Sequence, residues 1–305
     1  MRRELTDTTT SEVRTELIRA SQQLGGLATG VVLNLIIMTD EAGQHDAVRA
    51  ASQAGREHPC RVLGVIARDG RSASRLDAEV TVGESAAGQM LVLRIYGELS
   101  RHADSVVTPL LVPDTPVVIW WPGIAPPIPS ADPLGVLAQR RITDAASSSV
   151  PLDALRALAA GYRPGDTDLA WTRTTSWRSL LAATLDRPCG AISSASVVSE
   201  DDNPSAELMA AWLAGRLAVP VRREVSEGPG ITRVTFAASA GEIIISRPDG
   251  RNATLARPGE PDRFVALHRR DISELLGEEL RRLDPDEVYG EALGVLADDS
   301  AVARR

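Results

Sequence analysis

The chain has 305 residues, of which 43% are hydrophobic and 24% charged, and its formal net charge is −8 at pH 7. This length is about twice that of a typical ~150-residue domain, so the sequence predicts two folded domains. The negative net charge argues against nucleic acid and anionic membranes as partners, because both repel such a surface.

Strands and helices alternate in the first half of the chain. Residues 31–38 (VVLNLIIM) and 61–67 (RVLGVIA) are continuous apolar runs, typical of buried parallel strands, and the Ala-rich residues 45–56 between them are predicted to be helical. Two further strands are predicted at residues 91–96 and 116–121, with a helix between them at residues 101–111. This pattern indicates an α/β fold with an open, mostly parallel sheet flanked by helices.

A further helix is predicted after the Pro-rich residues 122–133. Asp132 suits its N-cap and Pro133 its first position, while Arg140 and Arg141 would lie in its last turn, where a helix favours cations. The Ser-rich residues 145–165 are typical of a break between domains. The predicted domains are therefore residues 1–163 and 164–305.

The second half predicts an α+β domain. Helices are expected at residues 177–185, capped by Ser176, and at 204–217. Four short β-like runs between residues 231 and 270, separated by Pro-Asp-Gly and Pro-Gly turns, indicate an antiparallel meander. A last helix at residues 272–283 places an apolar stripe on one face.

The composition excludes several kinds of catalysis. All 33 basic residues are Arg and none is Lys, which removes the P-loop lysine, the Schiff base and the kinase-type lysine. Cys60 and Cys189 lie far apart without a CxxC motif, so both are predicted to be free thiols. The chain has no apolar run of transmembrane length, and its first residues lack the apolar stretch of a signal peptide, which predicts a cytoplasmic protein.

No short motif predicts a catalytic, cofactor or metal site. The cluster Gly25, Gly26 and Gly30 is not GxGxxG, and Ser85 lacks the GxSxG spacing of a nucleophile elbow. His58 and Cys60 form only half of a zinc-deaminase motif. Asp166 and Asp168 precede a helical stretch, where helix capping is favoured over catalysis.

Tryptophan and arginine, the preferred anchors of protein interfaces, supply the candidate partner-binding residues. Trp120 and Trp121 end a predicted strand, where alternation directs the two rings to opposite sides. Either one ring lies in the core and the other at the surface, or both lie in the core, and the sequence favours neither alternative. The candidates are Trp120, Trp121, Arg140, Arg141, Trp171, Arg173, Trp177 and Arg178.

Six longer segments, spread over both predicted domains, carry a resemblance to a known family. They are residues 56–67 (REHPCRVLGVIA), 102–123 (HADSVVTPLLVPDTPVVIWWPG), 132–145 (DPLGVLAQRRITDA), 165–186 (GDTDLAWTRTTSWRSLLAATLD), 203–217 (NPSAELMAAWLAGRL) and 269–289 (RRDISELLGEELRRLDPDEVY). Together they resemble the OpcA family, the glucose-6-phosphate dehydrogenase assembly proteins, and in particular its actinobacterial members.

The resemblance implies a non-catalytic assembly factor or allosteric activator subunit of glucose-6-phosphate dehydrogenase, the first enzyme of the oxidative pentose phosphate pathway. It implies the dehydrogenase as protein partner and no cofactor. In cyanobacterial relatives the effect is tied to redox control, but this chain has no close cysteine pair to serve as a thiol switch.

Two alternatives stay open at this point. One is a sensor or enzyme that binds a sugar phosphate in an arginine-lined cleft at the carboxyl edge of the α/β sheet, a common ligand location in such folds. A phosphate-bearing ligand is therefore not excluded. The other alternative is a general scaffold with no preference for the dehydrogenase.

Overall fold

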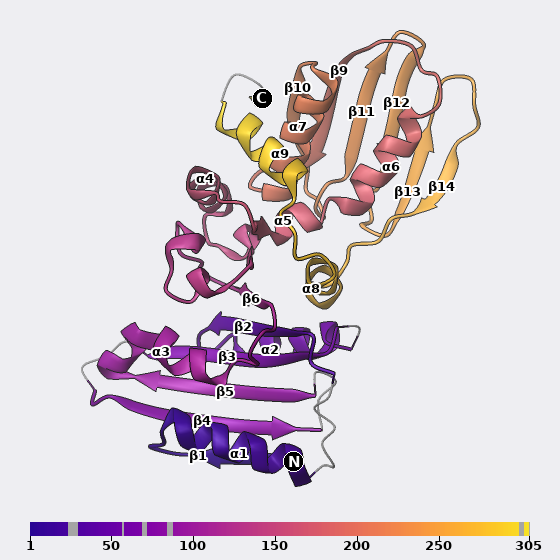
Figure 1. Ribbon diagram of the computed structural model, residues 1–305. Helices are drawn as coiled ribbons and strands as arrows, with labels where there is room; N and C mark the ends of the chain where they lie inside the picture. Colours follow the sequence, from indigo (N-terminus) through magenta and orange to yellow (C-terminus); the bar gives the residue numbers. More distant parts are fainter. Residues whose placement is uncertain (24–29, 57, 69–71, 84–87, 299–301, 305) are drawn as a thin grey trace. The chain divides into compact units, whose positions relative to one another are not determined.

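The structure, a computed structural model, describes residues 1–23, 30–56, 58–68, 72–83, 88–298 and 302–304 (Figure 1). The chain divides into two units. Unit 1 contains Met1–Asp144 and Ile272–Pro285, and unit 2 contains Ala145–Asp271 and Asp286–Arg305. This division in space differs from the predicted border near Arg163, because residues 145–163 lie in unit 2 and a late segment of the chain returns to unit 1.

A mostly parallel sheet forms the centre of unit 1, with strand order β1-β4-β5-β3-β2-β6-β7. The strands are β1 (Arg2–Leu5), β2 (Leu33–Thr39), β3 (Cys60–Arg68), β4 (Arg75–Val82), β5 (Gln89–Tyr96), β6 (Val117–Trp120) and β7 (Arg140–Thr143). Strands β5, β3, β2, β6 and β7 are parallel neighbours, whereas β4 and β1 add antiparallel pairs at one edge. The predicted open, mostly parallel α/β sheet is confirmed.

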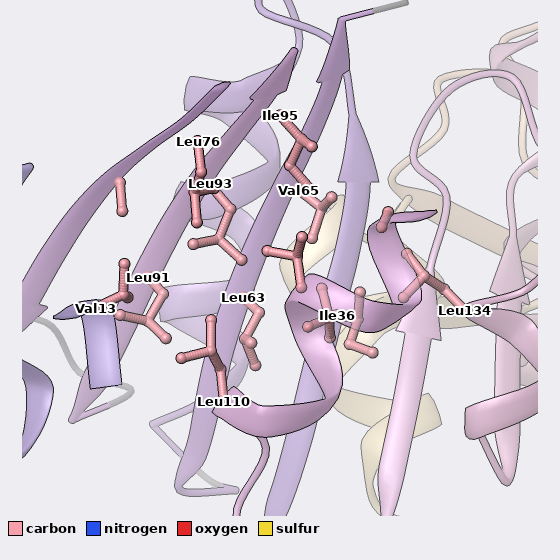
Figure 2. Packing of buried hydrophobic residues seen from close by; sticks show 14 of the residues in the cluster. Val13, Ile36, Leu63, Val65, Leu76, Leu91, Leu93, Ile95, Leu110 and Leu134 are labelled. Atoms are coloured by element: carbon pink, nitrogen blue, oxygen red, sulfur yellow. The ribbon is translucent and has the colours of Figure 1, made fainter. Parts of the chain in front are cut away.

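Helices cover both faces of this sheet because its central strands are apolar on both sides. The helices of unit 1 are α1 (Thr10–Gln23), α2 (Gln44–Ala54), α3 (Ala103–Val107) and α8 (Ile272–Leu280). Helices α1 and α3 pack on one face against a cluster that includes Ile36, Leu63 and Leu91 (Figure 2). Helix α2 packs against β2 and β3, with Ala47, Ala50 and other small residues buried.

Helix α8 belongs to unit 1, although it follows most of unit 2 in the chain. Its apolar stripe was predicted correctly, and Leu275, Leu276 and Leu280 are buried. The helix packs against α2. The sequence pattern therefore predicts the apolar face of α8. It does not predict that this face packs against α2 in unit 1.

The predicted helix over residues 133–141 is wrong. Asp132 does cap a turn, since its carboxylate accepts hydrogen bonds from the amides of Leu134 and Gly135. The turn is a short 3-10 helix (Gly135–Leu137), and Arg140–Thr143 pair with β6 as strand β7. Gly135 lies against the carbonyl oxygen of Pro129, an approach that the side chains of strong helix formers do not permit.

Unit 2 contains the second sheet, with strand order β14-β13-β12-β11-β9-β10-β15. Its strands, together with the short β8, are β8 (Asp166–Asp168), β9 (Ile192–Ser199), β10 (Val221–Val225), β11 (Arg233–Ala238), β12 (Gly241–Ser246), β13 (Asn252–Ala256), β14 (Arg263–Ala266) and β15 (Val302–Arg304). Strands β11 to β14 form an antiparallel meander, whereas β10 pairs in parallel with β9 and β15. The predicted α+β domain with an antiparallel meander is confirmed.

The helices of unit 2 contribute to two apolar clusters. They are α4 (Pro151–Gly161), α5 (Leu169–Thr172), α6 (Thr175–Leu185), α7 (Pro204–Leu217) and α9 (Glu287–Ala297). Helices α6 and α7 cover one face of the sheet (Figure 1) through residues such as Trp177, Leu181 and Met209. Helices α4, α5 and α9 share a second cluster with α7. Much of the Ser-rich segment 145–165, predicted as a break between domains, is therefore helix α4 of unit 2.

Candidate functional site

Six of the eight candidate partner residues are buried. They are Trp120, Trp121, Arg140, Arg141, Trp171 and Trp177. Of the two alternatives for Trp120 and Trp121, the structure has both in the core, because the two residues are only 1% and 3% exposed. Strand β6 is covered on both faces, so strand alternation directs both rings into the interior. Of the candidates, Arg173 and Arg178 are half-buried and retain contact with solvent.

The two buried arginines of unit 1 have structural partners. Arg140 makes a buried ion pair with Glu279 of α8 and donates a hydrogen bond of 2.8 Å to the carbonyl oxygen of Asp284. Arg141 donates a hydrogen bond of 2.7 Å to the carbonyl oxygen of Ala138. These guanidinium groups therefore hold α8 and the β6–β7 connection, rather than presenting charge at the surface.

In unit 2, Trp171 and Arg178 belong to one packed group. The Trp171 indole donates a hydrogen bond of 2.8 Å to Asp286, and its ring centroid lies 5.7 Å from that of Tyr289. The Arg178 guanidinium lies over the Trp171 ring, 3.6 Å from its centroid, which is a close cation–π contact. Arg178 also donates to the hydroxyl of Thr174 at 3.0 Å.

The carboxyl edge of the unit 1 sheet has a cleft, but the charged side chains that line it are acidic and do not favour an anion. Thr39, Ala67 and Trp121 line the cleft at the ends of β2, β3 and β6, where the strand order reverses and α/β folds bind ligands. The charged residues that line it are Asp40 and Asp132, and no arginine does so in the described part of the chain. The arginine-lined cleft expected at this edge is therefore not found among the described residues.

Arginines gather instead in a pocket of unit 2, which we call the arginine pocket. It is lined by Arg173, Arg247, Arg269 and Arg270, together with residues from the starts of α6 and α7. Its water-accessible volume is about 70 Å³. Arg173 is one of the candidates from the sequence, and Arg269 and Arg270 form one of several Arg pairs there that could hold a sugar phosphate. Only Arg247 has no signal in the sequence that separates it from the other arginines.

Arg247 is the buried member of the arginine pocket, with 5% of its surface exposed. Its guanidinium donates hydrogen bonds to the carbonyl oxygens of Leu267 and Ile231 at 3.1 and 3.0 Å, and it lies 5.0 Å from the centroid of the Trp177 ring. Burial, and then the charge of Arg269, lower the pKa of Arg247 to about 10. Arg247 therefore stays cationic at neutral pH.

The two carboxylates weighed as catalytic groups, Asp166 and Asp168, hold backbone amides. Asp168, fully buried, is the N-cap of α5, and its two oxygens accept hydrogen bonds from the amides of Ala170 and Ala145 at 2.8 and 2.9 Å. Asp166 lies in β8 and accepts from the amide of Arg163 at 2.7 Å, within a turn. The favoured interpretation as a helix cap therefore fits Asp168 but not Asp166.

The remaining sequence candidates offer no assembled site. Burial raises the pKa of the Cys60 thiol to about 12, which makes it a poor nucleophile and a poor redox switch at neutral pH. Gly25, Gly26 and Ser85 lie outside the described residues, and a Cβ atom added at Gly30 would have no atom within 4 Å. Within the described ranges, no group of three or more His, Cys, Asp or Glu residues is placed to hold a metal ion.

Family models match both halves of the chain. Residues 51–160 match the N-terminal domain, and residues 164–293 the C-terminal domain, of the family described as glucose-6-phosphate dehydrogenase subunit. The chain belongs to this family. The resemblance to the OpcA family found in the sequence is thereby confirmed, and so is the assembly or activator role toward glucose-6-phosphate dehydrogenase that it implies. The border between the two models falls at the predicted border near Arg163.

Other comparisons add little for this member of the glucose-6-phosphate dehydrogenase subunit family. Among curated proteins, none shows significant similarity to the chain. A 3-ketoreductase from Actinomadura kijaniata, crystallised with NADP and TDP-benzene, is 9% identical with a TM-score of 0.48, covering 90% of this chain and 98% of its own. An oxidoreductase from Sinorhizobium meliloti is 9% identical with a TM-score of 0.47, covering 89% of this chain and 96% of its own. Similarities this weak do not assign an activity to this chain.

No described helix is long and apolar enough to cross a bilayer.

Proposed function

We propose that this protein is a non-catalytic subunit that binds glucose-6-phosphate dehydrogenase in the cytoplasm and favours the assembled, active state of that enzyme. The observation that carries the proposal is the match to both family domains, which together run from residue 51 to residue 293. The hydrogen bonds that Asp166 and Asp168 accept from backbone amides, and the raised pKa of Cys60, support a role without catalysis of its own.

Activation by a subunit requires stronger binding to the active conformation of the dehydrogenase than to the inactive one. A tenfold rise in activity needs only about 1.4 kcal/mol of differential binding free energy. A modest contact surface is therefore sufficient, and the subunit needs no group inside the active site of its partner.

Direct contacts with the dehydrogenase are proposed for Arg173 and Arg178, the two half-buried members of the original candidate set. Arg178 is pre-oriented by its stacking on Trp171, which lowers the entropy lost when it pairs with a carboxylate of a partner. The six buried candidates would act on binding only through the packing that they support.

The deciding experiment titrates the dehydrogenase of the same organism with this protein at fixed enzyme and substrate concentrations. We expect a saturable rise in activity and co-elution of the two proteins on size exclusion. A flat titration without co-elution would remove the proposal.

Variants then test the surface. Arg173→Ala and Arg178→Ala are expected to weaken the complex about tenfold, the usual cost of losing an interfacial charged hydrogen bond. Arg156→Ala, an exposed arginine of α4 that pairs with Asp153, is the matched control and should bind normally. Unchanged affinity in both test variants would place the interface elsewhere.

A further inference from the structure

The arginine pocket concentrates positive charge without a carboxylate in its lining. Four guanidinium groups line it, and none of its described lining residues is Asp or Glu. Asp249 is the acidic residue whose charge acts on Arg247, and it is exposed rather than in the pocket. Neither Arg247 nor Arg269 forms an ion pair with any described residue. Like charges placed this close repel one another unless an anion lies between them.

Two buried donors in the pocket wall have no acceptor within the described chain. They are Nε of Arg247 and Nε1 of Trp177, whose side chains are 5% and 1% exposed. A buried N–H group without an acceptor costs about 1–3 kcal/mol, and more when the group is charged. Both donors belong to residues that line one cationic pocket, which favours an acceptor-rich ligand there.

Two helices begin at the pocket. Ser176 lies in the first turn of α6, and Ser205 in the first turn of α7, which starts after its N-cap Asn203. The helix dipole adds partial positive charge at each start, which favours an anion. In α7, Pro204 has no N–H and the amides of Ala206 and Glu207 already donate to Asn203, so the start of α7 contributes mainly this dipole.

Gly230 keeps the pocket open. Its φ of +67° is strained for other residues, and a Cβ atom there would lie 3.6 Å from Nη2 of Arg247 and 3.8 Å from Nε of Arg269. The absence of a side chain leaves both guanidinium groups accessible from the pocket.

We propose that the arginine pocket binds a phosphate group, either as free phosphate or as part of a small phosphomonoester such as a sugar phosphate. Phosphate carries up to two negative charges and several acceptor oxygens, which suits Arg247 and Arg269, two buried N–H groups and two helix starts better than a singly charged carboxylate does. The arginine pocket shares Arg173 with the proposed dehydrogenase contact, but the argument for phosphate does not rest on that contact. It gives the subunit its own means of sensing a phosphorylated metabolite.

The test uses the full-length protein without the dehydrogenase, so its result is separate from that of the activity titration. Binding of inorganic phosphate and of glucose 6-phosphate is measured by calorimetry and by the melting temperature, with sodium chloride of equal ionic strength and glucose as controls. We expect saturable binding and a raised melting temperature with one or both phosphates, and no effect of either control. Tighter binding of glucose 6-phosphate would identify a sugar phosphate as the ligand, whereas equal or tighter binding of inorganic phosphate would identify the phosphate group itself.

Variants locate the site. Arg247→Gln and the exposed Arg269→Gln are each expected to weaken phosphate binding about tenfold or more, since each removes a charged hydrogen-bond donor. Arg263→Gln removes one exposed arginine outside the pocket and should bind as the parent does. Arg269→Gln keeps the test valid if the Arg247 variant fails to fold. The proposal is overturned if neither phosphate binds above the chloride control, or if Arg269→Gln and Arg263→Gln bind phosphate equally.

Discussion

At the scale of single residues, the chain uses arginine inside its units as well as on its surface. Arg140 of β7 and Glu279 of α8 form an ion pair whose side chains are 3% and 6% exposed, and Arg223 and Glu207 form a similar pair in unit 2. Ionised groups are costly to bury, and that cost is offset only while both partners are present. Such pairs specify which elements meet, more than they add to stability.

The Arg140–Glu279 pair gives a prediction. Glu279→Gln is expected to lower the free energy of unfolding by about 3–5 kcal/mol, because it leaves the buried guanidinium of Arg140 without its counter-charge. Urea unfolding followed by circular dichroism measures the loss. The matched control is Glu291→Gln, which removes an exposed partner of Arg216 and should cost less than about 1 kcal/mol. Similar losses in the two variants would show that the buried pair contributes no more than a surface pair.

At the scale of elements, the sequence predicted best where one local signal was sufficient. Helix α7 coincides with its predicted residues, 204–217, because Asn203 accepts a hydrogen bond from the amide of Ala206 and Pro204 suits the first helical position. The apolar runs of β2 and β3 are continuous because both faces of those strands are covered. Strands β4 and β9 were missed because polar residues alternate through them.

The arginine pocket could not be predicted from the sequence for a different reason. Arg173, Arg247 and Arg269 are far apart in the chain, and they are three among 33 arginines. Their convergence depends on the β12–β13 turn, the segment after β14 and the start of α6, which only the folded sheet brings together. The burial of the candidate tryptophans could not be predicted for a related reason, since residue type does not reveal which faces of a strand or helix are covered.

The wrongly predicted helix after Asp132 leads to the prediction at this scale. A Cβ atom at Gly135 would collide with the backbone carbonyl of Pro129, so Gly135→Ala must shift the 3-10 turn that leads into β7. We expect a loss of about 1–3 kcal/mol of stability, measured by thermal or urea unfolding. Gly294→Ala, at an exposed position of α9 with no atom near the added methyl group, should instead stabilise by about 0.5–1 kcal/mol. A neutral or stabilising effect of Gly135→Ala would mean that the residue can adopt the helix predicted from the sequence.

At the scale of the whole molecule, the units in space differ from the halves of the sequence. The second family model, residues 164–293, includes α8, yet α8 belongs to unit 1 and packs against α2. Unit 1 is therefore incomplete until the chain has passed through most of unit 2. A fragment that ends at Asp144 lacks helix α8, which packs against α2. It also lacks the two groups that Arg140 binds, the carboxylate of Glu279 and the carbonyl oxygen of Asp284.

We predict that the fragment of residues 1–144 lacks a cooperative unfolding transition, whereas the same fragment joined to residues 272–285 regains one. A Gly/Ser linker of about 20 residues, with an average reach of about 25 Å, supplies the connection without adding structure. The reason is that α8 restores both an apolar partner for α2 and the counter-charge of Arg140. Thermal unfolding followed by circular dichroism compares the two fragments. The linked fragment with Glu279→Gln is the matched control. It keeps helix α8 but lacks the counter-charge of Arg140, so its melting temperature should be well below that of the linked parent. If residues 1–144 alone unfold as cooperatively and at as high a temperature as the linked fragment, α8 is not required for unit 1 to fold.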